Sequence, residues 1–377
     1  MRFVMFYHSL VSDWNHAPAH VLRGVSSELL ARGHEVDIYE PRDGWSRARL
    51  VAEHGQEPLL RFQADFPQLT STTYDPTALD LDAVLADADA VLVHAWTDPQ
   101  LIARIGQHRD RHGGYALLLH DSHRRGATDV VGEDLRHYDG ILAAGAAIRQ
   151  SRVTDGMGPV WTWHEAADPT IFHPHTSASG ELGVVWIGNW RDGEQDPDLE
   201  EFFIGPVRRL RLRAAVHGVG WPAAARGALT AAGIEYHGWL ANVQVPQVFA
   251  DTRCTIHVPR RPQARDLPGV PSIRIFEALA CGIPLVSAPW DDVDGLFRPG
   301  QDYLVARDGA EMDHHLTDLL GDPGYARAIA ANGLERIQAR HTCAHRVDEL
   351  LAILADLGAD EDNEEAVLVD ENEEDSR

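Results

Sequence analysis

The chain has 377 residues, 44% of them hydrophobic, and a formal net charge of −25. This length allows two domains with separate cores, and the acidic balance argues against a phosphate-rich nucleic acid as a partner. No run is apolar enough to cross a bilayer, so we expect a protein that is not transmembrane. The N-terminus does not have the features of a secretion signal and the chain has few cysteines, so we expect a cytoplasmic protein.

The first 168 residues predict a doubly wound, mostly parallel α/β sheet, which is typical of a Rossmann-like domain. The expected strands are residues 2–7, 35–40, 90–94, 115–119 and 140–144. The expected amphipathic helices are residues 17–32 and 98–111. Residues 42–80 are rich in turn formers and have a weak hydrophobic period, so we expect an irregular excursion there.

A second strand–helix series begins after Gly180 and indicates a second Rossmann-like domain, residues 169–340. Its expected strands are residues 183–187, 211–216, 234–236, 254–258, 284–287 and 302–305. Its expected helices are residues 221–232, 243–251, 272–281, 310–320 and 323–339.

A last helix is expected within residues 341–358, and an acidic segment follows it. Residues 360–375 hold ten acidic side chains and no basic one. Such a run is too charged to bury a core, so residues 359–377 predict a disordered acidic tail.

Residues 268–287 are the most informative segment of the chain. Ser272 is the expected N-cap of a short helix, and Gly282 marks its end before a buried strand. The start of such a helix offers free backbone N–H groups and suits a phosphate. Glu277 lies just over one turn further on and could accept hydrogen bonds from ribose hydroxyls. The alternative is that Glu277 only pairs with Arg274 on the same helix face.

The run from Glu277 to Ser287, Glu-Ala-Leu-Ala-Cys-Gly-Ile-Pro-Leu-Val-Ser, resembles the donor-nucleotide motif of GT-B glycosyltransferases. It is most similar to the family 4-like group and its CgeB-like (spore maturation protein) relatives. Residues 165–174 resemble the interdomain crossover of that group, and residues 335–346 resemble its ending. The resemblance implies two Rossmann-like domains facing a central cleft, with the acceptor on the first domain, the donor on the second, and the last helix packing back on the first.

The resemblance also implies a hexosyltransferase-like enzyme that moves a sugar from a nucleotide-diphosphate donor to an unidentified acceptor, without a metal or other cofactor. The chain contains no lysine, so a diphosphate clamp would have to use arginine. Gly269 stands where family 4-like members usually carry another glutamate. Two alternatives therefore stay open: a catalytically weak or inactive nucleotide-sugar-binding partner protein, and a nucleotide-sugar epimerase.

Expected donor contacts lie at the carboxyl ends of the second-half strands and at the helix start, because doubly wound sheets bind ligands at those ends. The alternative for the arginines among them is an ordinary solvated position. The expected donor-binding residues are Gly188, Asn189, Arg191, Arg260, Ser272, Ile273, Arg274 and Glu277.

On the acceptor side, His120 and Asp121 follow a buried strand, and a histidine with a pKa near neutral could act as a base. The alternative is a histidine that only caps the backbone. Asp13 and His16, after the first strand, form a second acceptor-side candidate.

Three other patterns predict little chemistry. Gly218-Val-Gly-Trp-Pro-Ala223 fits a dinucleotide fingerprint, but it lies in the second unit of its half. The Asp87-Ala-Asp89 run resembles the metal motif of the other glycosyltransferase fold, but it precedes an early strand, where we expect the end of a helix. The histidines at 314, 315, 341 and 345 have helical settings and no matching ligand cluster, so we expect no metal site.

Overall fold

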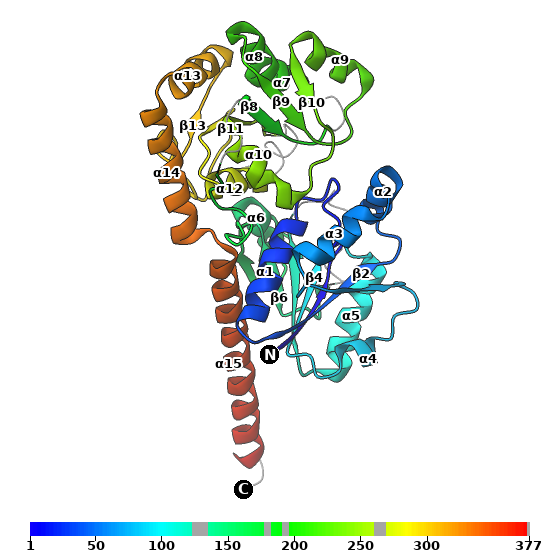
Figure 1. Ribbon diagram of the computed structural model, residues 1–377. Helices are drawn as coiled ribbons and strands as arrows, with labels where there is room; N and C mark the ends of the chain where they lie inside the picture. Colours follow the sequence, from blue (N-terminus) through cyan, green and yellow to red (C-terminus); the bar gives the residue numbers. More distant parts are fainter. Residues whose placement is uncertain (123–134, 177–181, 191–195, 260–268, 375–377) are drawn as a thin grey trace.

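The computed structural model of the chain contains two α/β domains, each built on a parallel sheet flanked by helices (Figure 1). Of residues 196 and 359–374 only the backbone is described. The segments outside the described residues are 123–134, 177–181, 191–195, 260–268 and 375–377.

The N-terminal sheet has the strand order β3-β2-β1-β4-β5-β6-β7, and every neighbouring pair is parallel. Phe3 of the central β1 lies opposite both Val36 of β2 and Ala90 of β4. β1 and β4 are nearly continuous apolar runs because helices cover both faces of the sheet. The strands are β1 Arg2–Phe6, β2 Glu35–Pro41, β3 Ser71–Tyr74, β4 Ala90–His94, β5 Ala116–Asp121, β6 Gly140–Ala143 and β7 Val160–Thr162.

The helices of this domain are α1 Ala19–Ala31, α2 Trp45–His54, α3 Glu57–Asp65, α4 Leu81–Leu85, α5 Pro99–His112 and α6 Ala146–Thr154. The prediction of an irregular excursion at residues 42–80 was wrong, because α2, α3 and β3 lie there. The helices α2 and α3 each bury only two residues, so their hydrophobic period is too weak to be read from the sequence.

The C-terminal sheet has the order β10-β9-β8-β11-β12-β13 and is also parallel throughout. Its strands are β8 Leu182–Ile187, β9 Ala214–His217, β10 Ile234–Tyr236, β11 Thr252–His257, β12 Leu285–Ser287 and β13 Leu304–Val305. Its α-helices are α7 Asp196–Leu199, α8 Gly205–Leu210, α9 Ala223–Ala231, α10 Val245–Ala250, α12 Ile273–Ala280, α13 Gly309–Gly321 and α14 Pro323–Arg340. A π-helical turn, Glu200–Ile204, joins α7 to α8, and a 3₁₀ turn, Asn242–Gln244, precedes α10.

Two chain crossings join the domains, one through residues 163–172 and one at Thr342. They are paired: the Ala167 N–H donates to the His341 carbonyl, and the Cys343 N–H donates to the Ala167 carbonyl, each at 2.9 Å. After the return crossing, α15, Cys343–Glu374, packs against α1 (Figure 1). A Cβ on Gly24 of α1 would stand 2.4 Å from Cys343 Sγ, so only glycine permits this close packing.

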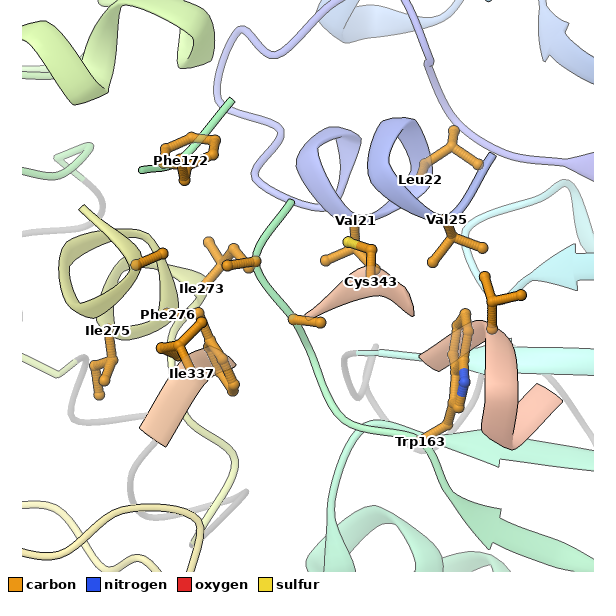
Figure 2. Close-up of a cluster of buried hydrophobic side chains, with 14 of the residues drawn as sticks. Val21, Leu22, Val25, Trp163, Phe172, Ile273, Ile275, Phe276, Ile337 and Cys343 are labelled. Carbon is orange, nitrogen blue, oxygen red and sulfur yellow. The ribbon is translucent and has the colours of Figure 1, made fainter. Parts of the chain in front are cut away.

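A single hydrophobic cluster continues across the domain boundary (Figure 2). It contains Val21 and Val25 of α1, Phe276 of α12, and Trp163 of the crossing, all of them buried. The Trp163 indole N–H also donates to the Arg346 carbonyl at 2.9 Å. The domains therefore share buried apolar surface on the side of the crossings, which stabilises their relative position.

The helix α15 continues to Glu374, through most of the segment for which the sequence predicts disorder. That segment includes glutamates, alanine and leucine, which have good helix propensity, and it extends a helix that is already nucleated by packing on α1. Among the described residues, no helix combines the length and the hydropathy that a membrane crossing would need.

Candidate active-site cleft

A cleft lies between the domains, at the carboxyl ends of both sheets. Next to the cleft, each sheet has the pair of strands at which its strand order reverses: β1 and β4 in the first sheet, β8 and β11 in the second. Open α/β sheets bind ligands at such a point. The described residues that line it are Asn15, Ala17, Pro18, Trp96, Ser122, Glu165, Trp186, Ile187, Gly188, Asn189, Ile256, His257, Val258, Pro259, Gly269, Val270, Pro271, Ser272, Ile273, Arg274, Trp290 and Asp291.

The N-terminus of α12 forms one wall of the cleft, as the sequence predicts. Ser272 is the N-cap, and its Oγ accepts a hydrogen bond from the Arg274 N–H at 3.3 Å. Ser272, Ile273 and Arg274 all line the cleft. Among the described lining residues Arg274 is the one cationic side chain at neutral pH. The positive end of the helix dipole and a guanidinium therefore converge there, a combination that suits a phosphate.

Glu277 lies behind this wall and is not among the described lining residues. It is fully buried: Oε1 lies 3.0 Å from His20 Nδ1, and Oε2 accepts from Arg274 Nη1. Burial alone would raise the pKa of Glu277, but Arg274 and His20 hold that pKa below its ordinary value. The structure thus contains the pairing with Arg274 that the sequence left open as the alternative to a ribose contact.

His20 has a defined tautomer in this arrangement. Its Nε2 accepts a hydrogen bond from the Asp168 N–H at 2.9 Å, so the proton is on Nδ1 and is donated to Glu277. Glu277 therefore links α12 to α1 of the other domain and holds Arg274 at the cleft edge.

Glu165 is a cleft residue that the sequence did not single out. It lies in the first interdomain crossing, its exposed fraction is 8%, and it has no hydrogen-bond or ion-pair partner among the described residues. Burial, and then the nearby Glu277 carboxylate, raise the pKa of Glu165 to about 7. A carboxyl group with a pKa near neutral inside a cleft can accept a proton at physiological pH.

The loops after β8 and β11 form the floor of the cleft on the second domain. Gly188 follows β8, and a Cβ there would stand 2.4 Å from the Trp186 ring. Asn189 spans the cleft, since its Nδ2 donates to Asn15 Oδ1 at 2.9 Å. Burial lowers the pKa of His257 to about 4, so this lining histidine is neutral at pH 7. The other expected donor residues, Arg191 and Arg260, lie outside the described residues.

Comparison with known proteins agrees with this architecture. Residues 193–352 match the family model described as Glycosyl transferase-like. Among solved structures, sucrose-phosphate synthase (tll1590) from Thermosynechococcus elongatus is 13% identical and superposes with a TM-score of 0.65 over 95% of this chain and 99% of that one. The chain has the GT-B fold.

Two further GT-B structures resemble this chain at similar identity. Anabaena Alr3699/HepE, in complex with UDP and glucose, is 14% identical with a TM-score of 0.64, over 94% of this chain and 99% of that one. An alpha-glucosyltransferase, in complex with UDP and a 13-mer DNA containing an HMU base, is 12% identical with a TM-score of 0.70, also over 94% and 99%. No curated protein sequence matches the chain.

The expected acceptor pair His120 and Asp121 lies behind the wall of the GT-B cleft. His120 Nδ1 is 2.9 Å from the Tyr7 hydroxyl, and its ring packs edge-on against Trp163. Asp121 pairs with Arg152 at 2.7 Å. Neither residue is among the described lining residues, whereas Ser122, the next residue, is. The end of β5 is thus placed at the cleft as expected, but its side chains contact the protein interior.

Asp13 and His16 are likewise absent from the described cleft lining. Asp13 joins the domains: Oδ1 accepts from the Trp239 indole at 3.1 Å, and Oδ2 accepts from the Asn242 N–H at 3.0 Å. His16 is buried against the rings of His8 and Trp96. The loop after β1 therefore reaches the cleft through Asn15 rather than through the two residues that the sequence favoured.

Gly269 lines the GT-B cleft in a conformation that only glycine adopts readily. Its φ is +85°, and a Cβ there would stand 2.1 Å from Val293 Cγ2. A glutamate at this position would be strained by the positive φ and would push against the Val293 side chain. The conformation at Gly269 thus favours glycine over the glutamate expected there. Glu165 and Asp291 are the described carboxylates that line the cleft.

Proposed function

We propose that this protein is a glycosyltransferase of the hexosyl type, which transfers a sugar from a nucleotide-diphosphate donor to an acceptor hydroxyl. The observation that carries the proposal is the N-terminus of α12 with Arg274, at a cleft between two Rossmann-like domains. The match of residues 193–352 to the Glycosyl transferase-like model supports it, as does the UDP in the complexes of two structural neighbours. The resemblance at residues 335–346 supports a place in the CgeB-like group.

In this proposal the donor diphosphate binds at the start of α12. The positive end of the helix dipole and the Arg274 guanidinium stabilise the negative charge that develops on the leaving diphosphate. Arg191 and Arg260 remain candidates for additional contacts. Because cationic side chains and the helix terminus supply the charge stabilisation, we propose that transfer does not require a metal.

Glu165 is the proposed proton acceptor. During transfer the acceptor oxygen forms a bond to the anomeric carbon, the bond from that carbon to the diphosphate breaks, and its electron pair stays on the diphosphate oxygen. The hydroxyl proton moves to the Glu165 carboxylate. A base with a pKa of about 7 combines a useful ionised fraction with proton affinity at neutral pH.

The donor site is tested by comparing binding of a nucleoside diphosphate with binding of the nucleoside. A thermal-shift panel of UDP-, GDP-, ADP- and dTDP-sugars first identifies the base, because a bound ligand raises the melting temperature. Calorimetry then compares wild type with Arg274→Ala. A charge-assisted hydrogen bond is worth about 1.5–3 kcal/mol, so the diphosphate affinity should fall roughly 10- to 150-fold while the nucleoside affinity stays unchanged.

Arg298→Ala is the matched control. Arg298 also pairs with a fully buried carboxylate, that of Asp302 four residues later, at 2.7 Å, but it does not line the cleft. This variant should bind both ligands as wild type does. Wild-type diphosphate affinity in Arg274→Ala would refute the proposed phosphate site.

A nucleotide-sugar-binding protein without transferase activity is the second candidate, and Gly269 favours it. The positive φ there disfavours the glutamate that family 4-like members carry. Turnover of the identified nucleotide sugar separates the two candidates. Sugar transfer or slow donor hydrolysis supports the enzyme, whereas tight binding with no turnover supports the binding protein.

A further inference from the structure

Two histidines and an aspartate meet at the end of the N-terminal domain that lies away from the second domain. His108 and His112 are one turn apart on the last turns of α5, and Asp82 is in the first turn of α4 (Figure 1). His108 Nε2 lies 3.2 Å from Asp82 Oδ1, and His112 Nε2 lies 3.7 Å from the same oxygen. All three candidate ligand atoms lie within 4.8 Å of one another.

These separations fit a tetrahedral transition-metal ion. Zinc binds imidazole nitrogen and carboxylate oxygen at about 2.0–2.2 Å, so two ligands of a tetrahedral site are about 3.4 Å apart. The two separations that involve Asp82 lie on either side of that value. An imidazole pair at a spacing of four residues also places both nitrogens on one helix face.

The surrounding side chains support ligation by His108. Its Nδ1 lies 2.9 Å from the Tyr115 hydroxyl, which orients the ring so that Nε2 points at Asp82. Such a hydrogen bond on the second ring nitrogen is the usual companion of a metal-bound histidine.

We propose that His108, His112 and Asp82 form a binding site for a divalent transition metal, with zinc as its occupant. Two nitrogens and one oxygen select zinc and its neighbours over magnesium or calcium, which prefer oxygen ligands alone. Because Asp82 and His112 are 78% and 50% exposed by side chain, water can complete the coordination. The ion would cross-link α4 to α5.

The site is separate from the proposed donor chemistry. The helix α5 starts at Pro99, just after the cleft residue Trp96, and His112 is thirteen residues further along it. At 1.5 Å per residue this is about 20 Å from the cleft end of the helix. Metal binding at α5 and metal-independent transfer in the cleft are therefore compatible, and either proposal can be refuted by experiment without refuting the other.

The test uses tag-free full-length protein that has been stripped with EDTA and titrated with zinc chloride by calorimetry. Wild type should bind one ion, whereas His112→Ala and Asp82→Asn should each weaken binding at least tenfold. Both altered residues are exposed, so the fold should persist, and circular dichroism checks this. His314→Ala is the control, because His314 is 70% exposed and pairs at 3.4 Å with Asp318, four residues away, without a third ligand.

Two further readouts distinguish a built site from scattered histidine binding, since the chain has 21 histidines. Cobalt(II) in place of zinc should give the strong visible absorption of a tetrahedral ion in wild type and in His314→Ala only. Zinc should raise the melting temperature of these two proteins and not that of His112→Ala. Absence of one-to-one binding by wild type, or equal binding by His112→Ala, would overturn the proposal.

Discussion

Replacing Glu165 by glutamine should make the protein more stable at alkaline pH while abolishing sugar transfer. The free carboxylate is buried in the cleft without a partner among the described residues, which is an unfavourable position for a charge. Glutamine has nearly the same shape and no charge. Replacing a group that destabilises the fold but is needed for proton transfer should raise the stability and lower the activity.

The magnitude follows from the pKa. Burial and Glu277 raise the pKa of Glu165 from 4.5 to about 7, and each tenfold change in proton affinity corresponds to about 1.4 kcal/mol. Between these two pH values the folded protein keeps a proton that the unfolded chain has released. The contribution of Glu165 to the free energy of unfolding therefore falls by about 3 kcal/mol as the pH rises from below 4.5 to above 7.

Urea unfolding of wild type and Glu165→Gln at pH 4.5 and pH 8 measures this difference. The two proteins should be similar at the lower pH, and the variant should be more stable by up to about 3 kcal/mol at pH 8. The kcat/KM of wild type should rise with pH through about 7, as the base ionises, and the variant should show no transfer at any pH.

Glu311→Gln provides a control of opposite sign. The hydrogen bonds from Arg307 lower the pKa of Glu311 to about 2, so its stabilising contribution is present above pH 4.5 and is lost as the pH falls toward 2. This variant should be less stable than wild type at pH 8. If Glu165→Gln showed no gain in stability at pH 8, or retained transfer, the reasoning about the cleft carboxylate would be refuted.

Two further substitutions test the walls of the cleft. Glu277→Ala should lower the free energy of unfolding by about 3 kcal/mol, measured by urea titration, because it leaves the buried His20 Nδ1 without its acceptor and removes the charge that pairs with Arg274; wild-type stability with weakened nucleotide binding would instead support the ribose role. Gly269→Ala should destabilise by about 1–3 kcal/mol and weaken nucleotide binding in calorimetry, since its φ is +85° and the new Cβ would meet Val293. Gly233→Ala, where φ is +74° but nothing lies within 4 Å, should show only the strain and bind normally.

The motif at α12 could be predicted because its determinants are local. Ser272 caps the helix through a hydrogen bond to an N–H two residues away, and Gly282 ends it with a φ of +64°. Neither feature depends on distant parts of the chain. The side-chain directions around the motif do depend on them, and Glu277 turned inward because α1 brings His20 to it from the other domain.

On the acceptor side, too, the sequence does not determine the direction of the side chains. The sequence places His120 at the end of a strand, and the strand does end at the cleft edge. Whether that side chain faces the cleft or the interior was decided by Tyr7 and Trp163, which contact it from β1 and from the crossing. A pattern of apolar and polar residues contains no information about such long-range partners.

By itself, the sequence determined the two parallel sheets and the capped start of α12, because hydrophobic period, caps and turn glycines act between near neighbours. Only the tertiary structure decided which charged groups face the cleft. Glu165 became a candidate base because two crossings and two domains enclose it and keep water and counter-charges away. Burial and electrostatic coupling depend on segments that are distant in sequence, which is why this candidate base could not be identified from the sequence.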